Sequence, residues 1–104
     1  MYSITCNTEG LFTTKVFEVD KETDKRFYLK DFHQAYLKKE HVNSVVINAR
    51  VPEYQVYSQD LQVGMSEIYA VAKKEIDARH MMIKDVIKND RRMLKGMKKV
   101  IRNA

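Results

Sequence analysis

The sequence predicts an α+β fold, in which a small antiparallel sheet precedes one long basic helix. The first residues alternate between apolar and polar side chains, as β-strands do, and the last third repeats apolar residues at helical spacing with Lys and Arg opposite. A chain of 104 residues is long enough for one modest core. We expect an α+β body over residues 1–57 and a long helix over residues 58–104, both within one domain, with the helix projecting or dimerising.

The predicted body begins with a β-hairpin. Tyr2, Ile4 and Cys6 share one face of the first strand, and residues 8–10 supply a short turn. Residues 11–19, which are rich in Phe, Thr and Val, form the partner strand.

A charged loop, a short strand and a helix are predicted next. Residues 20–25 have no apolar side chain to bury, and residues 26–29 form a short third strand. Asp31 is placed to cap a helix that runs to about Glu40. The inner face of this helix carries Phe32, Ala35 and Tyr36.

The strand predicted at the centre of the sheet covers residues 44–51, which contain Val-Val-Ile and are stopped by Pro52. Residues 54–57 are a further strand or a lead-in to the helix. The predicted order is therefore β-β-(β)-α-β. Ser58 or Asp60 can cap the long helix, and Gly64 lies within its first turns.

Two faces of the long helix differ sharply in chemistry. A heptad pattern places one set of residues, here called the seam, along one side. The seam consists of Tyr69, Ala72, Ile76, Arg79, Ile83, Val86, Asp90, Met93, Met97 and Val100. The opposite side, here called the basic face, consists of Lys84, Lys88, Arg91, Arg92, Lys95, Lys98, Lys99 and Arg102.

The length of this helix bears on assembly. It would span roughly 65 to 70 Å at 1.5 Å per residue, whereas a compact domain of this size has a radius of gyration of about 13 Å. Either the helix breaks, at Gly96 or around residues 88–90, or a second copy of the chain covers the seam. In an antiparallel dimer Arg79 would face Asp90 of the partner twice.

Charge is distributed unevenly along the chain. Residues 1–72 hold eight Lys/Arg against ten Asp/Glu, a net charge of −2, while residues 73–104 hold eleven against four, a net charge of +7. Such a basic arm is typical of proteins that bind an anionic partner. A lone cysteine, Cys6, together with the lack of a leader or a spanning segment, leads us to expect a cytoplasmic protein.

Residues capable of catalysis are few. His33, Asp31, Glu40 and His41 lack the spacing of metal ligands, and Cys6 alternates with Ile4 as a buried residue would. We therefore expect no enzyme, no metal site and no cofactor.

A non-enzymatic regulatory protein that binds RNA or DNA through its basic face, as a homodimer, is the leading functional interpretation. The alternative is a protein-binding inhibitor or modulator, an accessory factor of viral type, that docks on an acidic surface of transcription, translation or defence machinery. Membrane binding is third, because the helix lacks Trp and Phe anchors. The aromatic residues of the body belong mostly to a core, although Phe12 or Tyr28 on an open sheet face could stack bases.

Overall fold

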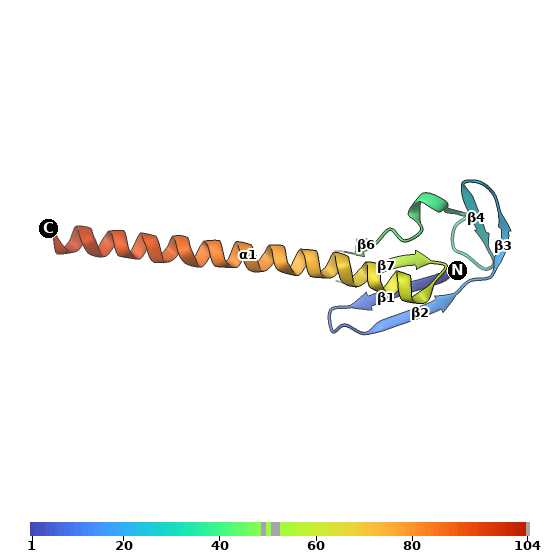
Figure 1. Cartoon of the computed structure of the whole chain (residues 1–104), viewed down its shortest axis with the longest axis horizontal. Helices are drawn as coiled ribbons and strands as arrows, with labels where there is room; N and C mark the ends of the chain where they lie inside the picture. Colours follow the sequence, from blue (N-terminus) through green and yellow to red (C-terminus); the bar gives the residue numbers. More distant parts are fainter. Residues whose placement is uncertain (49, 51–52, 104) are drawn as a thin grey trace. The chain divides into compact units, whose positions relative to one another are not determined.

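The structure, a computed structural model, describes residues 1–48, 50 and 53–103. It contains a four-stranded and a three-stranded antiparallel sheet followed by one long helix, which confirms the predicted α+β class (Figure 1). The chain divides into two compact units, Met1–Ala72 and Lys73–Ala104. This division falls at the same position as the change in charge along the sequence.

The first sheet has the strand order β2-β1-β7-β6. Its strands are β1 (Tyr2–Asn7), β2 (Phe12–Val16), β7 (Glu53–Ser58) and β6 (Val46–Asn48). The predicted hairpin is confirmed: β1 pairs with β2, and the Asn7 side chain accepts backbone hydrogen bonds from Glu9 and Leu11 across the turn. Gly10 has a φ of 80°, which an L side chain rarely adopts.

The strand predicted over residues 44–51 forms at Val46–Asn48, but its predicted central position is wrong. β6 is a three-residue edge strand with exposed side chains, whereas β7 lies between β1 and β6, and its Val56 is buried. Val56 is buried because it lies on the face of the sheet that packs against Ile68 of the long helix, a contact that the apolar run in β6 could not indicate. The predicted stop at Pro52 lies outside the described residues.

The helix α1 (Leu61–Arg102) packs onto this sheet through its first turns. Ile68 joins Ile4, Cys6 and Val56 in a buried cluster. Gly64 permits the close approach, because an added Cβ there would overlap Cδ1 of Ile4 and lie 3.0 Å from Cβ of Ser58.

The second sheet has the order β3-β4-β5, with β3 at Val19–Glu22, β4 at Arg26–Leu29 and β5 at Leu37–Lys38. The predicted strand at residues 26–29 is confirmed. The predicted loop at residues 20–25 is wrong in its first half, because β4 supplies backbone partners for β3. Likewise, the predicted strand 11–19 divides into β2 and the start of β3.

The helix predicted over residues 31–40 does not form. Asp31 has a φ of 56°, incompatible with the extended backbone of an N-cap residue. The segment is irregular, and then forms β5 and a 3₁₀ turn at Lys39–His41. Tertiary contacts override the local pattern: the Phe32 ring packs edge-on against Phe17 at 5.2 Å, and Leu37 is buried opposite Phe27.

The predicted cap of the long helix is confirmed. The Val63 N–H donates to Oδ1 of Asp60 at 2.9 Å, and the Asp60 N–H donates to Oγ of Ser58 at 3.2 Å. The helix continues for 42 residues, so the break considered at Gly96 or residues 88–90 is absent.

Candidate nucleic-acid interface

The basic face forms three parallel rows on α1, each repeating every seven residues. The rows are Lys84, Arg91 and Lys98; Lys88, Lys95 and Arg102; and Arg92 and Lys99. Seven residues span about 10.5 Å of helix, so like charges recur along one side at that interval. All eight side chains are exposed.

The charges of the basic face have no ion-pair partner among the residues that the structure describes. Lys84, Lys88 and Arg91 line an open depression together with Ile87, with no acidic residue among them. This face is therefore available to an anion.

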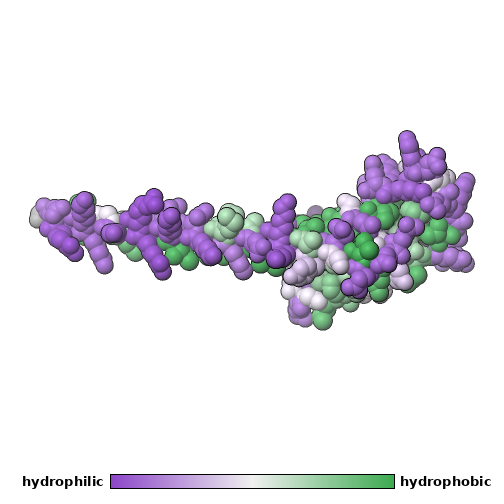
Figure 2. Space-filling view, viewed as in Figure 1, coloured by the Kyte–Doolittle hydropathy of each residue, from purple (hydrophilic) through white to green (hydrophobic). Residues whose placement is uncertain are grey.

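The seam is uncovered over most of its length. Figure 2 shows hydrophobic side chains among the hydrophilic ones along the exposed part of α1. From Ile76 to Asn103 every side chain is exposed, and Ile83 and Val86 are 55% and 57% accessible. By helical spacing, this stripe continues the face that carries buried Ile68. An apolar stripe of this extent is unusual for a surface that stays bare.

The two charged members of the seam, Arg79 and Asp90, do not meet within one helix. Eleven residues separate them, or roughly 16 Å. Their pairing across two chains stays a prediction.

The histidines do not gather into a site. His33 lies against the ring of Phe32, and Nε2 of His41 lies 3.7 Å from a carboxylate oxygen of Glu40. The described part of the chain contains no group of three or more His, Cys, Asp or Glu side chains that could hold a metal ion. Cys6 is a free, buried thiol, and burial raises its pKa.

Tyr28 was expected from the sequence as a candidate for stacking on bases, but the cluster of polar and aromatic side chains around that residue was missed by sequence reasoning. On the second sheet, the Arg26 guanidinium lies 4.1 Å from the Tyr36 ring centroid, and Nζ of Lys21 lies 5.7 Å from that of Tyr28. The alternation of Arg26 and Tyr28 with buried Phe27 and Leu29 was the available signal.

Comparison with protein-family models, curated proteins and solved structures found no match. Across the described residues, helices with the length and apolar character needed to cross a membrane are absent.

Proposed function

We propose that this chain is a non-enzymatic regulatory protein that binds nucleic acid through the basic face of α1. The three exposed rows of Lys and Arg support this proposal, because they offer phosphates a continuous line of unpaired cations. Contacts to phosphate position a protein without reading sequence. The basic face has more Lys than Arg, so we expect little base-specific recognition through this helix.

A second copy of the chain is the proposed occupant of the seam. In an antiparallel arrangement with the twofold axis between Lys84 and Asp85, Arg79 faces Asp90 of the partner twice. The same register places Ile83 against Val86, two exposed apolar side chains. Charge complementarity therefore favours the antiparallel register, and this apolar layer is compatible with it.

Docking on an acidic protein is the alternative. Exposed Met81, Met82, Met93 and Met97 on α1 favour it, since flexible methionines adapt to varied protein surfaces. In either case we place the protein in the cytoplasm, in keeping with its free cysteine.

Salt dependence of oligonucleotide binding tests the proposal. Affinity for duplex DNA should fall linearly in log salt, with a slope of about −0.9 per phosphate neutralised. The triple change Arg92→Glu, Lys95→Glu and Lys99→Glu should abolish binding measured by fluorescence anisotropy. The matched control, Lys15→Glu, Lys30→Glu and Arg50→Glu, alters charge equally in the first unit and should retain it. Wild-type protein that binds no nucleic acid at low salt would leave the acidic protein as the partner.

A further inference from the structure

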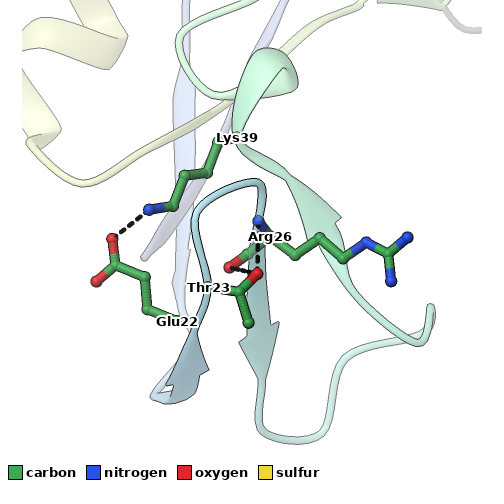
Figure 3. Close-up of polar contacts among 4 residues, drawn as sticks. All are labelled: Glu22, Thr23, Arg26 and Lys39. Carbon is green, nitrogen blue, oxygen red and sulfur yellow. Dashed lines mark hydrogen bonds and ion pairs between the residues drawn. The ribbon is translucent and has the colours of Figure 1, made fainter.

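The outer face of the second sheet carries aromatic and cationic side chains that are not part of its hydrophobic core. β4 directs Phe27 and Leu29 into a second buried cluster, which they form with Phe17 and Leu37. Arg26 and Tyr28 therefore lie on the opposite face. Strand register places Lys21 opposite Tyr28 and Lys38 opposite Arg26. Figure 3 shows Arg26 extending away from the Glu22–Lys39 ion pair, which measures 2.7 Å.

Two tyrosines share this outer face. The ring centroids of Tyr28 and Tyr36 are 6.1 Å apart, with the planes inclined by 58°. Both residues are partly exposed, so their rings are not fully buried in the core. Arg26 contacts both: its guanidinium lies over Tyr36, and a hydrogen bond with Tyr28 is the main cause of its raised pKa. The guanidinium thus lies beside both rings and carries a positive charge.

An open depression of about 520 Å³ adjoins this cluster. It is lined by the basic residues Lys25, Arg26, Lys38 and Lys39 and by the acidic residues Asp24 and Glu40. The positive charges outnumber the negative ones. The ion pair between Lys38 and Glu40 is exposed and long, at 4.0 Å, so it neutralises little of the positive charge. The lining therefore attracts anions, although the first unit as a whole is slightly acidic.

We propose that Tyr28, Tyr36 and Arg26 form a stacking platform for unpaired bases of single-stranded nucleic acid, with Lys21 and Lys38 contacting the phosphates. Aromatic faces and guanidinium planes stack on bases of any identity, and neighbouring cations bind the backbone. In a duplex the base faces are already stacked on one another, so the platform distinguishes single strands from duplexes. This proposal deepens the proposed function and rests on it.

Two ligands and three forms of the full-length chain test the platform. The ligands are a 12-nucleotide single strand of mixed sequence and the corresponding duplex. The test variant, Tyr28→Leu with Tyr36→Leu, removes the rings and keeps every charge. The matched control, Tyr28→Phe with Tyr36→Phe, keeps the rings.

The Leu variant should bind the single strand about tenfold or more weakly than wild type, and the duplex within about twofold of wild type. The Phe variant should bind both ligands as wild type does. Equal single-strand affinity of the Leu variant and wild type would overturn the platform while leaving nucleic-acid binding intact. Wild type that binds neither ligand would instead overturn the proposed function.

Tyrosine fluorescence tests the platform without depending on the Leu variant folding. The chain has six Tyr and no Trp, so its emission comes from tyrosine. Stacking should quench this emission when the single strand binds wild type, and the Phe variant should lose that part of the quenching while keeping its affinity. Identical fractional quenching of the two proteins would overturn the proposal.

Discussion

Gly64 determines how closely the helix approaches the first sheet. Its backbone lies where a side chain would overlap Ile4, so the position has a packing role that its place in a helix would not reveal. In a helix interior, glycine is otherwise unfavourable by about 1 kcal/mol relative to alanine. The close approach to the sheet outweighs that cost.

Gly64→Ala should therefore lower the free energy of unfolding by about 1–3 kcal/mol, despite the better helix propensity of alanine. Gly96→Ala is the matched control, since no atom lies within 4 Å of a Cβ at that position. It should raise helix stability by up to about 1 kcal/mol. Urea denaturation followed by circular dichroism measures both, and equal effects of the two changes would contradict the close contact.

Cys6 makes stability depend on pH in the alkaline range. Burial raises the pKa of its thiol above the ordinary value of 9.0. Between 9.0 and the raised value, the unfolded chain has lost the proton while the folded chain keeps it. The contribution of this group to the free energy of unfolding is therefore unchanged below 9.0 and falls as pH rises above it.

Urea denaturation of wild type and Cys6→Ala from about pH 7 to about pH 10 tests this. The difference in unfolding free energy between the two proteins should shrink above pH 9.0, because only wild type carries the thiol. Parallel pH profiles throughout the range would contradict the effect of burial on Cys6.

The charged seam positions of α1 predict an orientation for the proposed dimer. In the antiparallel register, Arg79→Asp places like charges at both contacts, and the double change with Asp90→Arg restores opposite charges. The double variant should recover much of the lost association, with a coupling energy of about 0.5–3 kcal/mol. Dimer dissociation constants of wild type, both single variants and the double variant measure it. Additive effects would exclude this pairing.

The sequence predicted elements with a long periodic pattern better than elements that depend on distant contacts. The hairpin and the long helix follow from spacing, turn chemistry and the Asp60 cap. The helix expected from Asp31 onward failed because Phe32 and Leu37 find partners far away in sequence. The centre of the first sheet was misplaced because strand order and the packing of α1 on β1 and β7, rather than apolar content, determine which strand is central and buried.

The candidate sites differ in the same way. The grouping of the basic residues on one side of α1 could be predicted from the sequence, because helical spacing alone determines which residues share a side, and the structure shows these side chains exposed. The platform of Tyr28 and Tyr36 could not be predicted, because β4 and the irregular segment before β5 meet only through the fold.

For the whole molecule, a slightly acidic first unit and a strongly basic second unit give the chain its net charge of +5. A polyanion would therefore be attracted mainly to the second unit. Association through the seam would place two such basic units in one particle and raise its effective affinity for a polyanion.

Sedimentation velocity tests that association. Wild type should sediment as a dimer, and Ile83→Glu should give a monomer, because it places a carboxylate in an apolar layer of the seam. Met81→Glu is the matched control, since Met81 is also exposed but lies off the seam. Its sedimentation should match wild type. A monomeric wild type at high concentration would contradict the dimer.

The exposure of every side chain from Ile76 to Asn103 also has a consequence for amide hydrogen exchange. An isolated helix is stabilised only by its own turns, and nucleation within it is costly, so its amides exchange with solvent through frequent local fraying. A partner that binds only the helical form adds stability by mass action. Protection of these amides should therefore rise with protein concentration or on addition of ligand, while amides of β1 and β7 keep a constant rate. The stability of the helix in the second unit should thus depend on protein concentration and on bound ligand.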